Sequence, residues 1–151
     1  MRFAGKSATQ WGGDPSRLVL AGHSAGAYIA AMLSFDPQWL RQVGLNSQAD
    51  LAGFIGLAGP YDFLPIQNRT LRTIFGGANR VETQPISFVT GKEAPALLIT
   101  ARRDRLVSPG NSRRMVLTRI ESDPSRRQHD VFDRGIRMRV SCGSEVMMFG
   151  C

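Results

Sequence analysis

Apolar residues fall into three short runs separated by helical or polar segments. The three runs, each of strand length, are residues 17–21, 53–58 and 93–100. The alanine-rich segment 25–34 has small side chains where a helix must lie close to a sheet, and Asp36-Pro37 is expected to end it. A second helix is predicted over 108–120, with Ser108 as cap and Pro109 at its first position. Strands alternating with helices predict an α/β fold with a parallel sheet and right-handed crossovers.

The remaining segments give weaker patterns. Residues 1–10 are expected to form a helix, and residues 60–92, rich in Gly, Pro, Asn and Thr, a loop with short helix. We therefore predict one core segment over 1–120 and an atypical basic tail over 121–151. In the tail, residues 135–140 alternate as a strand would, and two interpretations stay open: a diverged last strand, or a tail translated out of frame.

The segment Gly22-His-Ser-Ala-Gly26 stands between the first predicted strand and the first helix. A G-x-S-x-G pattern in that position is the nucleophile elbow of serine hydrolases. The turn must raise the serine hydroxyl above the sheet, so strand and helix backbones nearly touch, and Gly22 and Gly26 avoid a side-chain clash. Ser24 itself is expected in a strained conformation.

Three segments, in order, resemble the α/β-hydrolases of the carboxylesterase, hormone-sensitive-lipase and arylformamidase-like branch. They are Gly12-Gly-Asp-Pro-Ser-Arg-Leu-Val-Leu-Ala-Gly-His-Ser-Ala-Gly-Ala27, Gly56-Leu-Ala-Gly-Pro-Tyr-Asp-Phe-Leu64, and Pro95-Ala-Leu-Leu-Ile-Thr100 with Asp104-Arg-Leu-Val-Ser-Pro109 and Asn111-Ser-Arg-Arg114. The resemblance covers about residues 8–115. It implies the α/β-hydrolase fold and hydrolysis of carboxylic esters, with a small-molecule ester and water as substrates and no cofactor.

The chain is short for the fold that it resembles. It has 151 residues, whereas a complete α/β-hydrolase needs about eight strands and well over 200 residues. We therefore expect a partial fold, the middle and later part of a hydrolase without its early strands. The nucleophile strand would then have an edge left unpaired.

Serine needs a base, an acid that orients the base, and donors for the oxyanion. In α/β-hydrolases the chain order is Ser, then Asp or Glu, then His. Ser24 is the predicted nucleophile, and the N–H of Ala25, the next residue, the predicted oxyanion donor.

Two aspartates compete for the acid. Asp104 follows a predicted parallel strand at the carboxyl edge, where such sheets bind ligands, and is the first choice. Its alternative is a solvated aspartate paired with a neighbouring arginine. Asp62, at the end of the preceding strand, is the second candidate, although an aspartate in Tyr-Asp-Phe more often caps a helix.

The sequence contains two histidines, His23 and His129. His23 adjoins Ser24, and adjacent side chains diverge, so we expect it to pack near the elbow. His129 follows Asp104 in the required order and is the predicted base, although Arg127-Gln-His-Asp130 lacks the glycine-bearing loop that usually delivers this histidine.

Two functional hypotheses follow. The first is a carboxylic ester hydrolase with Ser24, Asp104 and His129. The second is a catalytically inactive fragment or a non-enzymatic binding module, because no His-Gly-Gly-Gly loop precedes the elbow in this sequence. Losing one oxyanion donor alone lowers the rate by about 10²–10³.

Charge and cysteine content change this picture little. The net charge is +7, and most of the excess comes from arginines after residue 100, which are scattered among acids without aromatic interleaving. We expect no nucleic-acid partner. The two cysteines, Cys142 and Cys151, suit neither a disulfide framework nor a metal site. No leader or membrane-spanning run stands out, so we expect a cytoplasmic protein without a membrane partner.

Overall fold

The computed structural model describes residues 2–125, 131–133 and 146–150. Its strands are β1 (Leu18–His23), β2 (Leu51–Leu57), β3 (Ala96–Ile99), β4 (Val131–Asp133) and β5 (Val146–Gly150). Its α-helices are α1 (Arg2–Ser7), α2 (Ala25–Phe35), α3 (Pro37–Arg41), α4 (Arg69–Phe75) and α5 (Gly110–Ser122). Three short 3₁₀ helices are η1 (Ala8–Trp11), η2 (Val81–Thr83) and η3 (Pro85–Phe88). None of the described helices is long and apolar enough to span a membrane.

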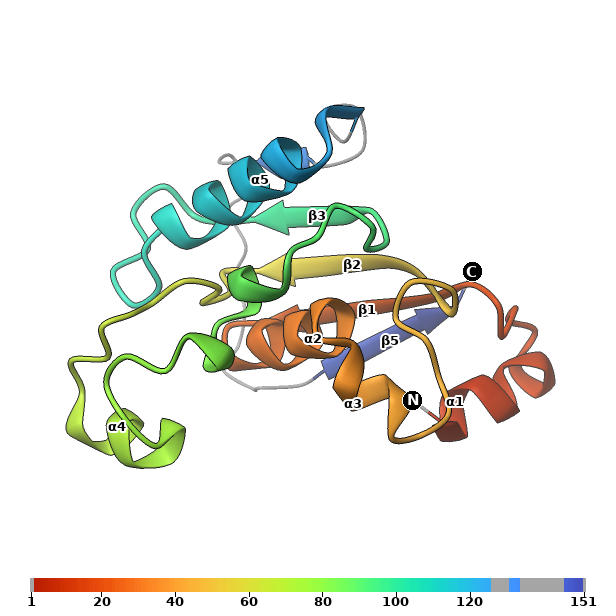
Figure 1. The fold of residues 1–151 in the computed structure, drawn as a ribbon. Helices are drawn as coiled ribbons and strands as arrows, with labels where there is room; N and C mark the ends of the chain where they lie inside the picture. The colour runs from red at the N-terminus through yellow and green to blue at the C-terminus, as the bar shows by residue number, and fades with distance from the viewer. Residues whose placement is uncertain (1, 126–130, 134–145, 151) are drawn as a thin grey trace.

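The strands form one sheet in the order β4-β3-β2-β1-β5. Figure 1 shows β3, β2, β1 and β5 side by side. β1, β2, β3 and β4 are parallel, with Leu20 opposite Phe54 and Phe54 opposite Ala96. The α/β fold class is therefore confirmed. β5 is antiparallel to β1 and lies along the edge that we expected to be unpaired. That expectation was wrong for this structure, because a segment from the basic tail occupies the edge.

The predicted element bounds differ from the observed ones by a few residues. The helix predicted over 25–34 is α2, which ends at Phe35, and Pro37 then begins α3, with Asp36 capping the N–H of Gln38 at 3.1 Å. The helix predicted over 108–120 begins two residues later, at Gly110, with Pro109 as its N-cap. The residues 135–140, predicted as a strand, lie outside the described residues, as do Cys142 and Cys151.

Small residues of α2 let the helix lie against the sheet. Ala27, Ala30 and Ala31 are fully buried, and they pack in one core with Leu20 of β1 and Phe54 of β2. A methyl group cannot hold the backbones apart as a longer side chain would, so the helix can begin directly above the end of its strand. The core thus fixes where Ser24, between β1 and α2, stands.

α5 is attached to the same core by a buried arginine. The Arg119 side chain is fully buried, and its Nη1 lies 3.2 Å from Oε2 of Glu93, which is also buried. Its Nη2 donates to the carbonyl oxygen of Ala94 at 2.9 Å, and its guanidinium lies 5.0 Å from the centre of the Phe35 ring. These contacts hold α5 against the segment that leads into β3 and against α2.

Candidate active site

The turn between β1 and α2 holds Ser24 in an unusual backbone conformation. Ser24 has φ 52° and ψ −119°, and among the described non-glycine residues only Ser24 and Ala58 have positive φ. Such a backbone conformation is unfavourable for any residue that has a Cβ, and it persists only where the surrounding structure imposes it. The strain expected at Ser24 is present.

The close contact of strand and helix requires glycine at position 22. A Cβ added to Gly22 would overlap the carbonyl group of Gly26 and lie 2.7 Å from the nitrogen of Ala27. No side chain fits there without moving the helix from the strand. Strand and helix therefore meet as the sequence pattern predicted, and α2 begins immediately after Ser24.

Main-chain hydrogen bonds fix the ends of the three central strands relative to one another. The N–H of Ser24 donates to the carbonyl oxygen of Leu57 at 2.8 Å, and the N–H of Ala58 donates to that of Ile99 at 2.8 Å. Ala58, at φ 49°, begins the loop that leaves β2. Ser24, this loop and the end of β3 are thus linked at the carboxyl edge of the sheet.

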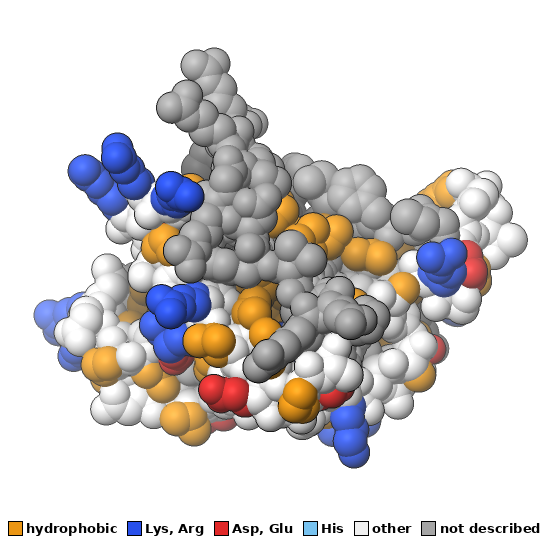
Figure 2. Space-filling model, turned by 90° about the horizontal axis from the view of Figure 1, so that it is seen from above, with side chains coloured by type: hydrophobic (Ala, Val, Ile, Leu, Met, Phe, Trp, Pro, Cys, Tyr) orange, Lys and Arg blue, Asp and Glu red, His pale blue; other side chains and the backbone are white. Residues whose placement is uncertain are grey.

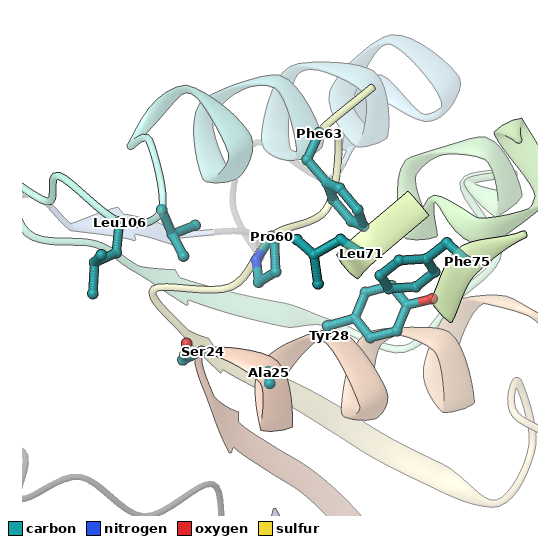
Figure 3. A pocket seen from close by; sticks show the side chains of 9 residues that line it. Ser24, Ala25, Tyr28, Pro60, Phe63, Leu71, Phe75 and Leu106 are labelled. Atoms are coloured by element: carbon teal, nitrogen blue, oxygen red, sulfur yellow. The ribbon is translucent and has the colours of Figure 1, made fainter. Parts of the chain in front are cut away.

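A pocket of about 320 Å³ opens beside Ser24 (Figure 3). The residues that line it are Ser24, Ala25, Tyr28, Pro60, Phe63, Leu71, Phe75, Leu106 and Val107. Apart from the Ser24 and Tyr28 hydroxyls, the lining side chains are apolar. The pocket is at the small end of the range for ligand sites.

Three aromatic rings form the inner wall of the pocket. The ring centres lie 5.9 Å apart for Tyr28 and Phe63, 5.6 Å for Tyr28 and Phe75, and 5.5 Å for Phe63 and Phe75, all edge to face. The Tyr28 hydroxyl donates to the carbonyl oxygen of Thr83 at 3.0 Å, and partial burial raises the pKa of Tyr28 above its ordinary value. The hydroxyl therefore stays protonated, and the wall stays uncharged, over the physiological pH range.

Asp104 lies in the loop that follows β3, as the sequence predicted. Its Oδ1 accepts hydrogen bonds from the N–H groups of Leu106 and Val107, both at 2.9 Å. These two residues line the pocket, so the loop that carries Asp104 also forms part of the pocket. Among the described residues Oδ2 accepts no hydrogen bond and no arginine forms an ion pair with Asp104.

The carboxylate of Asp62, the second candidate acid, is engaged elsewhere. It forms an ion pair with Nε of Arg114, whose Nη2 also donates to the carbonyl oxygen of Asp62 at 2.7 Å. The alternative of a helix cap was wrong, because the next helix, α4, is capped by Asn68. The structure thus gives Asp62 a part in holding α5 against the loop after β2.

Of the two histidines, only His23 lies among the described residues. His23 ends β1, opposite Leu57 of β2, and its side chain is partly buried. His129, the predicted base, lies outside the described residues. The structure therefore brings Ser24, Ala25 and the Asp104 loop to one pocket, while His129 stays a prediction.

Sequence reasoning missed the wall of the pocket. Tyr28 stands one helical turn after Ser24, a spacing that places both on one side of α2 and offered a signal. Phe63 and Phe75 lay in a segment without a periodic pattern, and only the fold brings them to Tyr28. The described residues contain no group of three or more His, Cys, Asp or Glu side chains that could hold a metal ion.

The carboxyl edge is rich in positive charge. Seen from above, Lys and Arg side chains gather toward the left, the side at which β1, β2 and β3 end (Figure 2). Arg102, Arg103 and Arg105 are exposed in the loop around Asp104.

A parallel sheet with a strained serine at a strand-to-helix turn beside an apolar pocket defines an α/β-hydrolase. The sequence of residues 1–118 matches BD-FAE, an esterase-like α/β-hydrolase family, and the chain belongs to that family. No curated protein matches the sequence.

Solved structures agree on the fold. The chain is similar to the native esterase 2 of Thermogutta terrifontis, with 19% identity and a TM-score of 0.66 over 89% of this chain and 50% of that one. The same esterase phosphoramylated by tabun gives 18% identity and 0.66 over the same shares. Its butyrate-bound form gives 18% identity and 0.65, over 89% and 51%. The chain thus spans about half the length of these structures, as a partial fold would.

Proposed function

We propose that this chain hydrolyses carboxylic esters through Ser24. The observation that carries the proposal is the strained Ser24, held between Gly22 and Gly26 and facing a pocket with an apolar lining. In α/β-hydrolases a strained serine at the turn between a strand and a helix exposes the nucleophile, and the conformation of Ser24 supports the same role here.

In the proposed reaction Ser24 Oγ attacks the ester carbonyl carbon and gives its proton to a histidine, which we assign as His129. The carbonyl oxygen becomes an oxyanion and accepts a hydrogen bond from the N–H of Ala25. The bond to the alcohol then breaks, and the alcohol leaves with the proton from the histidine. Water repeats these steps on the acyl-enzyme and releases the acid and free Ser24.

Local electrostatics support this assignment. α2 begins at Ala25 and has 11 residues, so its first N–H groups and its dipole favour negative charge beside Ser24. Oδ1 of Asp104 is held by two main-chain N–H groups, and its Oδ2 is the oxygen that would receive the Nδ1–H of the histidine. Asp104 therefore suits the role of orienting acid.

The pocket favours a short, uncharged acyl group. Its volume of about 320 Å³ and its aromatic wall offer no partner to a charged group. We therefore propose esters of short aliphatic acids as substrates, and no cofactor takes part. A cytoplasmic location and the lack of a nucleic-acid partner stay predictions.

Covalent labelling tests the nucleophile directly. Esterase 2 of T. terrifontis is phosphoramylated by tabun, so we would incubate this chain with a fluorophosphonate and locate the adduct by mass spectrometry. We expect one adduct on Ser24 and the loss of this adduct in Ser24→Ala. The adduct should be retained in Ser34→Ala, which changes another serine, near the C-terminal end of α2. Hydrolysis of 4-nitrophenyl butyrate, measured with the same variants and with His129→Ala, then tests the complete reaction.

The outcomes separate the two hypotheses. Labelling and turnover that both require Ser24 support the hydrolase. A chain that folds yet shows neither would be a binding module or an inactive member of the family, and the proposal would be wrong.

A further inference from the structure

Three consecutive main-chain N–H groups beside the pocket donate to two buried side-chain amides. The N–H groups of Tyr61 and Asp62 donate to Oδ1 of Asn111, at 2.9 and 2.8 Å. The N–H of Phe63 donates to Oε1 of Gln84 at 2.8 Å. The acceptors come from segments 50 and 21 residues away in the chain. We call Asn111 and Gln84 the amide pair.

Asn111 connects this segment to the acid loop. It is 6% exposed, and its Nδ2 donates to the carbonyl oxygen of Ser108 at 3.2 Å. Ser108 directly follows Val107, which lines the pocket and holds the Asp104 carboxylate through its N–H. One side chain thus joins the loop after β2 to the loop after β3.

Gln84 connects the same segment to α2. It is 1% exposed, and its Nε2 donates to Oγ1 of Thr83 at 2.8 Å. The carbonyl oxygen of Thr83 accepts the hydrogen bond from the Tyr28 hydroxyl. The rings of Tyr28 and Phe63 are therefore both fixed to the segment that ends at Gln84.

An amide suits both positions because each side chain accepts on one side and donates on the other. A buried N–H without an acceptor is costly, so losing either amide would let residues 61–63 move toward other partners. The Phe63 ring, which lines the pocket, would move with them because Phe63 belongs to this segment. Tyr28 and Phe75 would then lose a ring that lies within 6 Å of both.

We propose that Asn111 and Gln84 are positioning residues that set the place of Phe63 and thereby the pocket's preference for a longer acyl chain over acetyl. This inference rests on the proposed function in one respect only, which is that the group bound in the pocket is the acyl chain of an ester. Neither residue touches the reacting atoms. Their effect is therefore expected on selectivity rather than on the reaction of Ser24 itself.

Binding of non-hydrolysed amides tests this without relying on catalysis. We would titrate the full chain with butyranilide and with acetanilide, followed by NMR, for the wild type, Asn111→Asp, Asn111→Leu, Gln84→Glu and Gln84→Met. The two additional methylenes should give the wild type a preference of about tenfold for butyranilide. The Leu and Met variants should reduce this to about twofold or less. Asp and Glu still accept the N–H groups and should keep more of it.

The control is Asp36→Ala. It also removes a buried acceptor of a main-chain N–H, but at the far end of α2 from the pocket. This variant should keep the wild-type ratio at a similar loss of melting temperature. Hydrogen exchange of the 61–63 amides should accelerate only in the variants of the amide pair.

Unchanged binding ratios and unchanged exchange in all four variants would overturn the proposal, and so would a wild type that binds both anilides equally. If the wild type shows the preference but hydrolyses no ester, the positioning role stands and the hydrolase proposal fails. If the Leu and Met variants unfold, the Asp and Glu variants decide, because they lose the amide's donation to Ser108 or to Thr83. A butyranilide preference below that of the wild type would then support the proposal, and an unchanged preference would overturn it.

Discussion

Gly22 of β1 and Gly26 of α2 are in main-chain contact, with no room for a methyl group between them. This contact brings the N-terminus of the helix to the end of the strand within a single residue, Ser24. The positive φ of Ser24 follows from it, because the chain must reverse without a loop. The backbone conformation of Ser24 thus follows from the packing of Gly22 against Gly26.

Gly22→Ala should destabilise the protein by about 3 kcal/mol, since the new methyl group overlaps backbone that cannot move without opening the core. Gly53→Ala in β2 is the matched control. A Cβ there lies no closer than 3.6 Å to any neighbour, and little loss is expected. Urea denaturation of both variants measures the difference, and equal stabilities would contradict the contact.

Asp104→Asn should preserve the fold and abolish most activity. The amide oxygen can still accept the N–H groups of Leu106 and Val107, so the melting temperature should change little. The side chain can no longer stabilise a protonated histidine, and kcat for 4-nitrophenyl butyrate should fall by about 10⁴-fold. A loss of only a few-fold would assign the acid elsewhere. Asp62→Asn, measured in parallel, should retain activity.

Arg119→Met should lower the free energy of unfolding by about 3–5 kcal/mol, because it leaves the Glu93 carboxylate buried without its partner. Adding Glu93→Gln to this variant should recover part of the loss, since the uncompensated charge is removed. Thermal and urea unfolding of the two single variants and the double variant complete the cycle. Additive losses would show that the two side chains do not act as a pair.

Stability should fall at alkaline pH. Burial raises the pKa of Tyr61 far above its ordinary value of 10.0, so the folded state keeps a proton that the unfolded state loses. This contribution is fully present below pH 10 and is lost as pH rises beyond it, by up to about 1.4 kcal/mol per pH unit. Urea midpoints from pH 9 to 11.5 test this. Tyr61→Phe should have a shallower decline, and identical slopes would exclude Tyr61 as the cause.

Local patterns predicted the elements that local chemistry determines. The apolar run into Gly22, the small residues of α2 and the turn into Asp104 each act over a few residues, and the structure has β1, α2, β3 and the acid loop near the predicted positions. Bounds differed by one to three residues, because the ends of helices and strands depend on caps and neighbours as well as on periodicity.

Features that depend on distant contacts were missed. Phe63 and Phe75 belong to one wall with Tyr28 only through the fold, and the acceptors for residues 61–63 are amides from two other segments. Arg119 has the local sequence pattern of a surface charge in a basic stretch, yet its side chain is fully buried. It forms an ion pair with Glu93 and packs over the Phe35 ring. The pairing of β5 with β1 joins opposite ends of the chain and has no local signal.

The main-chain hydrogen bonds from Ser24 to Leu57 and from Ala58 to Ile99 link the carboxyl ends of the three neighbouring strands β1, β2 and β3. Ser24 follows the first of these strands and the Asp104 loop follows the third, and the two strands are two strand spacings, or about 10 Å, apart. In the proposed reaction, the spacing of the strands therefore sets the separation between Ser24 and Asp104 that a histidine has to bridge. Substitutions of pocket side chains are then expected to change which ester the proposed reaction accepts, while the backbone of the sheet sets the separation of the two proposed catalytic residues.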